Sequence, residues 1–369
     1  MFKSRSTYPI GIDIGTQKIY AVQFKKNDHD LVVRGWAHRE LDGEIEDSSE
    51  KRDTRVSLLK DMVHHAPFVG KRAVLHIPPK DIISFPIRFQ VGKEESLEEA
   101  ILRESKGSLS FPVEEAILDY PSIEPLSSDN TGKYMATVIA VQRDQIDKYL
   151  LMLKQAGLTV EAVDFKVSSL IRLHQYLFDV IRDPVLLCYT GKTESLLSIV
   201  TKDSVIAHRY FPWGTQTLLE KLVANLGLSN DRDKGKILLK KYGLLHEDRK
   251  DANEVADITE DTNAANMLRA IYQIITPYID ELTYEFQKTI GYFRSEAQNV
   301  VLNSIYIYGQ AALIHHLDRY LEKRIDIPVN QINPMAKVIL SDESILSDIT
   351  EGTGFDLALG LAMRKVTWL

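Results

Sequence analysis

The sequence has only one cysteine, Cys188, among its 369 residues, which excludes a disulfide framework and any multi-cysteine metal or iron–sulfur site. It also has no excess of positive charge, because 45 Lys and Arg residues stand against 52 Asp and Glu residues, a formal net charge of -7. Such a balance gives no general attraction to nucleic acid or to anionic lipid. No window approaches the roughly 18 apolar residues of a membrane-spanning helix, and the first residues lack the apolar core of a signal peptide. We therefore expect a cytoplasmic protein without a membrane span and without a nucleic-acid partner.

The chain instead contains one order of secondary-structure elements twice. In the first copy, short apolar runs and one apolar stripe predict strands at 10–14, 19–24, 31–33 and 73–77, and a helix at 54–65. The second copy predicts strands at 185–188, 196–200 and 205–209, and a helix at 215–225. Gly15 and Gly191 fall at equivalent hairpin turns. The duplication indicates two similar lobes with two glycine turns at a shared cleft, which is the plan of the actin, sugar-kinase and Hsp70 class of phosphate-binding folds.

An additional segment at 82–163 lies between the two copies and has its own helix and strand signals. The pattern predicts a helix at 94–106, a buried strand at 134–141 and a second helix at 143–156. We therefore expect a compact α+β subdomain inserted after the first copy.

The second half of the chain adds an acidic stretch and a long helix. Residues 246–264 are rich in acids and poor in large apolar residues, which favours a solvated loop. An amphipathic helix with Pro277 as a kink is predicted over about 268–293. The histidine pairs 64–65 and 315–316 are adjacent in sequence and have no third ligand at metal spacing, so we propose no metal site.

Several motifs carry a resemblance to a known family. The most specific is the run Ser110–Tyr120, Ser-Phe-Pro-Val-Glu-Glu-Ala-Ile-Leu-Asp-Tyr, and the run Ile12–Thr16 opens the match. Shorter matches are Gln155–Leu158 with Val163–Asp164, Phe211–Gly214, Lys241–Leu244, Gly291–Ser295 and Leu359–Ala362. Nearly end to end, the sequence resembles the PilM family of actin-like cytoplasmic proteins of type IV pilus assembly, which is related to the cell-division protein FtsA.

The resemblance implies an α/β, actin-like (ribonuclease H-like) two-lobe fold with the extra α+β subdomain of the PilM and FtsA type. The implied domains are a first lobe at 1–81, with 164–184 and about 345–369, an inserted subdomain at 82–163, and a second lobe at 185–344 with a helical subdomain at about 228–298. FtsA itself is disfavoured because we expect no amphipathic anchor helix after the fold.

The resemblance also implies an ATP site between the lobes, with two phosphate turns. A phosphate turn needs a flexible backbone with free N–H groups, a hydroxyl, and a carboxylate that holds magnesium-bound water. In the first turn the residues that meet these needs are Asp13, Gly15, Thr16 and Gln17. The second turn reads Tyr189, Thr190, Gly191, Lys192 and Thr193, so a tyrosine has replaced the metal-facing carboxylate. Its Gly-Lys-Thr resembles the end of a Walker A loop, but the first glycine of that motif is absent and we interpret it as a hairpin turn.

The two base-side elements of the family's site are also changed. The family's Ala-Glu-x-x-Lys helix is represented by Gly235, Lys236 and Leu239, which keep neither nucleotide contact. The adenine-side glycine turn reads Tyr308-Gly309, which puts a tyrosine ring where the backbone must approach the base. Three of the four elements are therefore degraded. We expect a vestigial nucleotide cleft with weak or absent ATP and magnesium binding, no hydrolysis, no catalytic residue and no cofactor.

The resulting hypothesis is a non-enzymatic, actin-fold adaptor of a type IV pilus or related secretion machine. The resemblance implies that the cytoplasmic tail of a PilN-like inner-membrane protein docks in a groove between the first lobe and the inserted subdomain, and that partners recruit the protein to the inner face of the inner membrane. One alternative is an active actin-fold ATPase or small-molecule kinase, which would keep the second-turn carboxylate and the adenine-side glycines. Another is the cytoplasmic GspL-like component of type II secretion, which would continue into a spanning helix.

Overall fold

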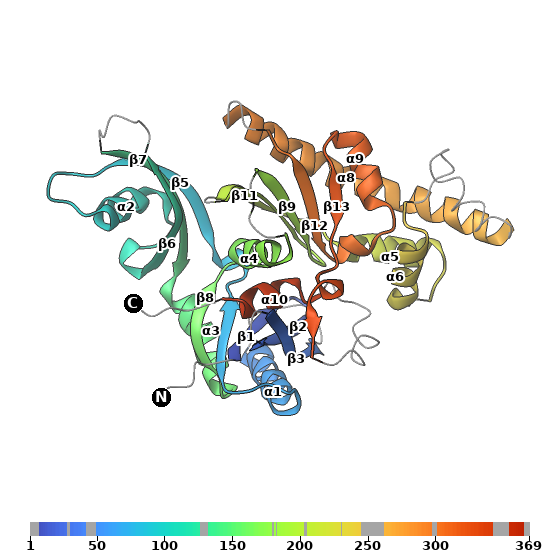
Figure 1. The fold of residues 1–369 in the computed structure, drawn as a ribbon, viewed down its shortest axis with the longest axis horizontal. Helices are drawn as coiled ribbons and strands as arrows, with labels where there is room; N and C mark the ends of the chain where they lie inside the picture. Colours follow the sequence, from blue (N-terminus) through green and yellow to red (C-terminus); the bar gives the residue numbers. More distant parts are fainter. Residues whose placement is uncertain are drawn as a thin grey trace. The chain divides into compact units, whose positions relative to one another are not determined.

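The computed structural model describes residues 7–27, 30–41, 49–125, 132–178, 181, 183–202, 205–229, 231–244, 262–296, 301–341 and 354–364. The chain divides into two compact units (Figure 1). The first unit comprises Met1–Leu173, Ile339–Asp342 and Leu357–Leu369, and the second comprises His174–Val338 and Glu343–Asp356. Most of the predicted acidic loop at 246–264 lies outside the described residues. The finer domain boundaries predicted from the sequence stay a prediction.

A six-stranded sheet forms the base of the first unit. Its strands are β1 (Thr7–Ile14), β2 (Lys18–Asn27), β3 (Asp30–Glu40), β4 (Arg72–His76), β8 (Thr159–Asp164) and β14 (Ile339–Leu340), in the order β14-β3-β2-β1-β4-β8. β1, β2 and β3 form an antiparallel meander, whereas β4 runs parallel to β1 and β8 runs parallel to β4. On one face, Leu59 of α1 (Ser49–His65) and Leu153 of α3 (Arg143–Gln155) join Ile10 and Ile12 in one buried cluster.

The opposite face of this sheet is covered by α10 (Asp356–Ala362). The next helix, α4 (Lys166–Phe178), contacts α10, because the Ser169 hydroxyl donates to the carbonyl of Leu357 at 2.7 Å. Gly11 alternates with Ile10 and Ile12 on β1, and a Cβ on Gly11 would lie 2.2 Å from the carbonyl oxygen of Ala358. A side chain at this position would therefore push α10 off the sheet. The carboxylate of Asp164, at the end of β8, is held by Arg172 of α4 and by Arg364, which follows α10.

The first unit also contains a three-stranded antiparallel sheet in the order β5-β7-β6, drawn in blue-green in Figure 1. Its strands are β5 (Ile83–Gln90), β6 (Ala116–Pro125) and β7 (Lys133–Gln142), with α2 (Leu97–Ser105) and the short 3-10 turns η1 (Pro79–Asp81), η2 (Lys106–Ser108) and η3 (Val113–Glu115). Ala100 and Ile101 of α2 pack on Ile87 and Val138 of the sheet.

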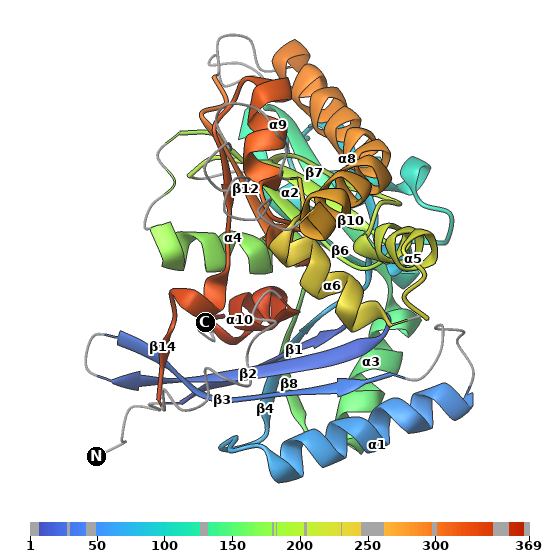
Figure 2. The same cartoon turned by 90° about the vertical axis from the view of Figure 1, so that its right-hand side faces the viewer.

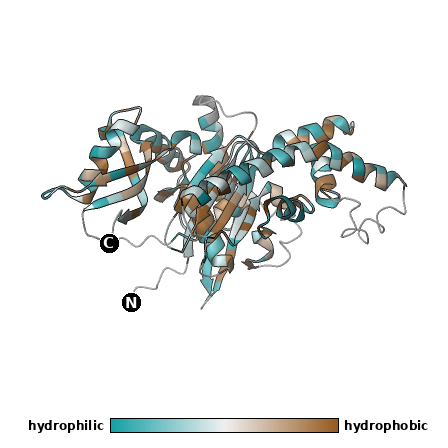
Figure 3. Cartoon of the chain, turned by 90° about the horizontal axis from the view of Figure 1, so that it is seen from above, coloured by the Kyte–Doolittle hydropathy of each residue, from teal (hydrophilic) through white to brown (hydrophobic). Residues whose placement is uncertain are grey.

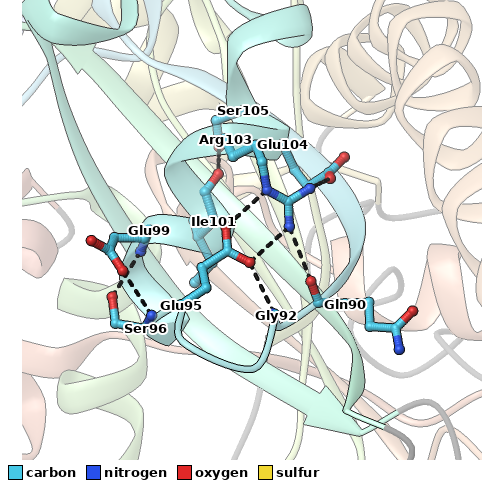
Figure 4. Close-up of polar contacts among 9 residues, drawn as sticks. All are labelled: Gln90, Gly92, Glu95, Ser96, Glu99, Ile101, Arg103, Glu104 and Ser105. Carbon is cyan, nitrogen blue, oxygen red and sulfur yellow. Dashed lines mark hydrogen bonds and ion pairs between the residues drawn. The ribbon is translucent and has the colours of Figure 1, made fainter.

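Local polar contacts fix the start of α2 (Figure 4). Ser96 accepts the N–H of Glu99 while the Glu99 side chain accepts the N–H of Ser96, a capping box. Arg103 reaches back from the last turn and bonds both carboxylate oxygens of Glu95 and the carbonyl of Gln90. These bonds tie the loop after β5 to the helix that follows it.

The second unit repeats the topology of the first. Its strands are β9 (Val185–Thr190), β10 (Ser195–Val200), β11 (Val205–Phe211), β12 (Ser304–Gly309) and β13 (Val329–Gln331), in the order β11-β10-β9-β12-β13. β9, β10 and β11 form an antiparallel meander, β12 is parallel to β9, and β13 is parallel to β12. The order of meander, helix and parallel strand is that of β1, β2, β3, α1 and β4, so the duplication predicted from the sequence is confirmed.

The described helices of the second unit include α5 (Thr215–Asn225), α6 (Arg232–Lys241), α8 (Thr262–Glu296) and α9 (Leu317–Ile325), with η4 (Gln310–Leu313) and η5 (Pro334–Ala336) (Figure 2). Apolar residues along the length of α8, among them Ile275, Leu282 and Phe286, join Leu197 and Ile307 of the sheet in a large core. The alternation of brown and teal along the helices in Figure 3 reflects this one-sided burial. The predicted long helix is confirmed, with Pro277 inside it.

Candidate functional site

The first glycine turn joins β1 to β2 and is held by hydrogen bonds of its own backbone. The backbone N–H of Gly15 donates to the carbonyl of Lys18 at 2.9 Å, and the carbonyl of Gln17 accepts the N–H of Leu41 at 2.7 Å. Thr16 is exposed at the tip of the turn. The Gly15 N–H, which a phosphate turn would aim at its ligand, is therefore engaged within the hairpin.

Asp13, the expected metal-facing carboxylate, is paired with a histidine. Nε2 of His76 lies 2.7 Å from Oδ1 of Asp13, and both residues are almost fully buried. The other ring nitrogen, Nδ1, lies 3.1 Å from the carbonyl oxygen of Ile77. Both nitrogens thus face oxygen acceptors. The Asp13 carboxylate is consequently engaged by a side chain of the fold at the position where a nucleotide site would use it for hydrated magnesium.

His76 was not among the residues predicted from the sequence, although the two strands carry a signal for it. β1 and β4 are parallel neighbours, with Ile12 opposite Leu75. The next residue of each strand, Asp13 and His76, therefore points to the same face at the same edge. A histidine directly after the apolar run 73–75 of β4 is the feature that could have identified the pair.

The second glycine turn joins β9 to β10 and has the same closure. The N–H of Gly191 donates to the carbonyl of Glu194 at 3.0 Å, which matches the bond of Gly15 in the first turn. Tyr189 and Lys192 are half-buried, and Thr193 is exposed. The turn residues named from the sequence do form a hairpin, as expected, and its glycine N–H is again engaged internally.

The carbonyls of this turn are bonded to the N-terminus of α5. The N–H of Thr215 donates to Gly191 at 3.2 Å, and the N–H of Gln216 donates to Lys192 at 2.9 Å. A Cβ on Gly214 would lie 2.0 Å from the Lys192 carbonyl oxygen, so glycine is needed for this approach. The first N–H groups of a helix are the ones that bind phosphate. Here two of them are engaged by the hairpin.

The adenine-side turn is locked to the second hairpin. The Thr190 hydroxyl donates to the carbonyl of Tyr308 at 2.9 Å and accepts the N–H of Ala311 at 2.8 Å. Gly309 has a φ of 81°, and a Cβ there would lie 2.1 Å from the Thr190 carbonyl oxygen. Its N–H donates to the buried carboxylate of Asp356 at 2.6 Å. Like His76, Asp356 was not among the residues predicted from the sequence.

Tyr308 is a core residue. It is fully buried, and its hydroxyl lies 2.8 Å from Nδ1 of His174, on the face of β12 opposite to Ile307. Burial, with a smaller contribution from the charge of Lys337, lowers the pKa of His174 to about 4. The neutral ring can accept the Tyr308 hydroxyl hydrogen. The alternation of β12 directs the Tyr308 ring into the core against His174, and its effect on the adenine-side approach stays a prediction.

The α6 helix carries the two remaining candidate positions. Leu239 is 5% exposed and belongs to the core of the second unit. Lys236 pairs with Asp233 one turn earlier, with Nζ 2.8 Å from Oδ1. Gly235 lies against α5, since a Cβ there would lie 3.2 Å from a methyl carbon of Val223. These roles are packing and surface pairing on one helix.

The structure groups the candidate residues by unit. β9 and β12 are neighbouring parallel strands with Thr190 beside Gly309, so the second turn and the adenine-side turn lie together in the second unit. Asp13, Gly15, Thr16 and Gln17 lie together in the first unit. Within each group, these hydrogen bonds hold hairpins, a helix end and a tight turn in place.

The first unit has a second candidate region where its two sheets meet. Ile77, Val141 and Ile146 are buried there, and half-buried apolar side chains surround them: Ile82, Ile117, Tyr149, Leu150 and Val163. We call these five half-buried residues the junction surface. The Tyr149 hydroxyl donates to Asp81 at 2.9 Å, which connects α3 to η1. The junction surface thus offers apolar area beside a hydrogen-bonded polar pair.

Comparison with solved structures agrees with the class that this topology defines, an actin-like fold. A structure described as the PilM-PilN type IV pilus biogenesis complex matches with a TM-score of 0.74 and 21% identity over 97% of this chain and 98% of that chain. The ethanolamine utilization protein EutJ from Carboxydothermus hydrogenoformans matches with a TM-score of 0.54 and 12% identity over 97% of this chain and 90% of that one. The predicted fold class is confirmed.

The family is established by sequence. The sequence model of a family described as type IV pilus assembly protein PilM matches residues 11–248 and 235–366. The chain therefore belongs to the PilM family of type IV pilus assembly proteins, as the motifs had indicated.

Two further findings concern the described part of the chain. No described helix is long and apolar enough to cross a membrane. Among the same residues, no three His, Cys, Asp or Glu side chains are grouped closely enough to hold a metal ion.

Proposed function

We propose that this chain is a non-enzymatic adaptor of the type IV pilus machinery that holds the cytoplasmic tail of a PilN-like inner-membrane protein. Membership of the PilM family supports a place in pilus assembly. The solved relative with the TM-score of 0.74 is described as a complex with PilN, which supports a partner of that kind. We further propose that the protein is cytoplasmic and that PilN-like and other assembly proteins recruit it to the membrane.

One observation supports the proposal that the chain is not an enzyme. The groups that would bind a nucleotide make hydrogen bonds within the fold instead. Asp13 is bonded to His76, and the N–H groups of Gly15 and Gly191 close their own hairpins. The Thr190 hydroxyl makes two bonds inside the fold, and Leu239 is buried in the core. A nucleotide would have to break several of these bonds before making its own, and each net contribution is about 0.5–1.5 kcal/mol.

A titration tests this part directly. We expect isothermal titration calorimetry of the whole chain with ATP and magnesium to show no binding in the low-micromolar range, with a circular dichroism spectrum that shows a folded protein. Low-micromolar affinity would refute the degraded-site proposal and would favour the alternative, an active actin-like ATPase.

The docking part rests on the junction surface. An extended peptide needs apolar pockets for its alternate side chains and polar groups for its backbone. The junction surface supplies half-buried Ile82, Ile117 and Leu150, and the Tyr149–Asp81 pair lies beside them. We propose that the tail docks on this surface, between the six-stranded and the three-stranded sheets of the first unit.

Two neighbouring leucines on α3 give a matched test. Leu150 belongs to the junction surface, whereas Leu151 is 48% exposed and lies outside the buried clusters of the described residues. We expect Leu150→Arg to weaken binding of a synthetic cytoplasmic-tail peptide of the PilN-type protein from the same genome at least tenfold, measured by fluorescence anisotropy. Leu151→Arg should bind like the wild type. Equal binding by the two variants would place the tail elsewhere.

A further inference from the structure

The second unit has an open cavity between α5 and α8, with a volume of about 450 Å³. Its lining includes Lys221 and Leu226 at the end of α5, and four residues in the first half of α8: Ala270, Gln273, Ile274 and Pro277. We call this cavity the α5–α8 groove. Its size falls within the range of about 300–1,000 Å³ that is usual for ligand pockets.

The groove combines an apolar floor with polar groups. Leu226, Ala270 and Ile274 are half-buried, so their side chains are accessible from the groove without being fully exposed. Lys221 is the cation of the lining, and no lining residue is an anion. Such a combination fits a ligand with an apolar group and a nearby negative charge.

Pro277 removes one backbone hydrogen-bond donor from α8 beside the groove. Proline has no backbone N–H, so the carbonyl of Gln273, four residues earlier in α8, receives no helical hydrogen bond from it. Gln273 and Pro277 both line the groove. Lacking this donor, the Gln273 carbonyl can accept an N–H from a ligand, and a peptide backbone is the group that offers such a donor beside an apolar side chain.

Lys221 is available for a carboxylate. Its ammonium has no ion pair among the residues that the structure describes. Its neighbour Glu220, which could otherwise compete for it, is paired with Arg232 at 2.8 Å and accepts from Gln216 at 3.0 Å. The Gln273 side chain also makes no hydrogen bond with the described part of the chain and can donate to the same carboxylate.

From these observations we propose that the α5–α8 groove binds an acidic peptide segment of a protein partner. An apolar side chain of the peptide fills the floor, a neighbouring Asp or Glu pairs with Lys221, and a backbone N–H donates to the Gln273 carbonyl. The groove lies in the second unit, whereas the junction surface lies in the first, so this proposal stands or falls independently of the tail-docking proposal.

Peptide selection with a blocked variant tests the proposal. A random dodecapeptide phage library is first depleted on the Ala270→Arg variant of the whole chain, whose added side chain fills the groove, and is then panned on the wild type. Peptides that survive require the groove. We expect them to share an apolar residue next to Asp or Glu.

Affinities of a synthesised, fluorescein-labelled survivor are then measured by anisotropy. We expect Lys221→Ala to weaken binding about tenfold, the effect of one charge-assisted bond, and to flatten its salt dependence. Ala265→Arg, the same change at another half-buried alanine of α8 outside the lining, should leave binding unchanged. Circular dichroism melting of each variant confirms the fold.

Three outcomes would overturn the proposal. The first is that no peptide survives depletion. The second is that the survivors carry no acid or bind Lys221→Ala as well as the wild type. The third is concentration-dependent self-association in sedimentation velocity that Ala270→Arg abolishes, because the occupant would then be a second copy of this chain.

Discussion

Acid should destabilise the second unit through His174. This residue is 3% exposed, and burial, with the charge of Lys337, lowers its pKa from 6.5 to about 4. Between these values the unfolded chain binds a proton that the folded chain does not. Above pH 6.5, His174 therefore does not lower the free energy of unfolding. As the pH drops from 6.5 towards 4, it lowers this free energy progressively. At about 1.4 kcal/mol per pKa unit, the loss is about 3 kcal/mol.

We expect His174→Gln to remove this loss, because the amide does not titrate while its oxygen can still accept the Tyr308 hydroxyl hydrogen. Urea unfolding is followed by the fluorescence of Trp213 in a background of Trp36→Phe and Trp368→Phe, so that the signal reports on the second unit. Between neutral pH and pH 4, the wild type should lose about 3 kcal/mol more of its free energy of unfolding than the variant does.

The comparison isolates one group. Burial also lowers the pKa of His208, but His208 is present in both proteins, so its contribution cancels in the difference. Parallel pH profiles of the two proteins would refute the reasoning, since they would mean that His174 titrates alike in the folded and unfolded chains.

Other substitutions test the turn, the core and the α10 contact. Gly309→Ala should cost at least about 2 kcal/mol in urea unfolding, because the residue has a positive φ and a Cβ would clash with a backbone carbonyl. Leu239→Lys, which introduces the lysine that the sequence resemblance implies at this position, should lower the melting temperature and bring no gain in ATP affinity by calorimetry, because the position is buried. Asp164→Ala should cost about 2 kcal/mol in urea unfolding, since it removes a buried carboxylate shared by two partly exposed arginines; an unchanged transition would contradict that role.

Local sequence patterns predicted the elements that depend on local chemistry. The helix predicted at 215–225 coincides with α5, and the helix predicted at 143–156 matches α3 to within one residue. β8 was not predicted because Glu161 interrupts its apolar pattern. The charge of this largely buried carboxylate is compensated by Arg72 of β4, which pairs with it at 2.8 Å. The compensation comes from a strand far away in sequence, so no local window contains it.

In the candidate site, too, the partners of the predicted residues come from distant parts of the sequence. The motifs identified the two hairpins correctly, because a glycine turn between strands is a local signal. What decides their chemistry is supplied by distant residues: His76 is 63 positions from Asp13, and Asp356 is 47 positions from Gly309. Each pair meets only because parallel strands or a returning helix bring them together. A motif can therefore establish that a phosphate turn has the right backbone, while the partners that engage its polar groups become visible only in the folded chain.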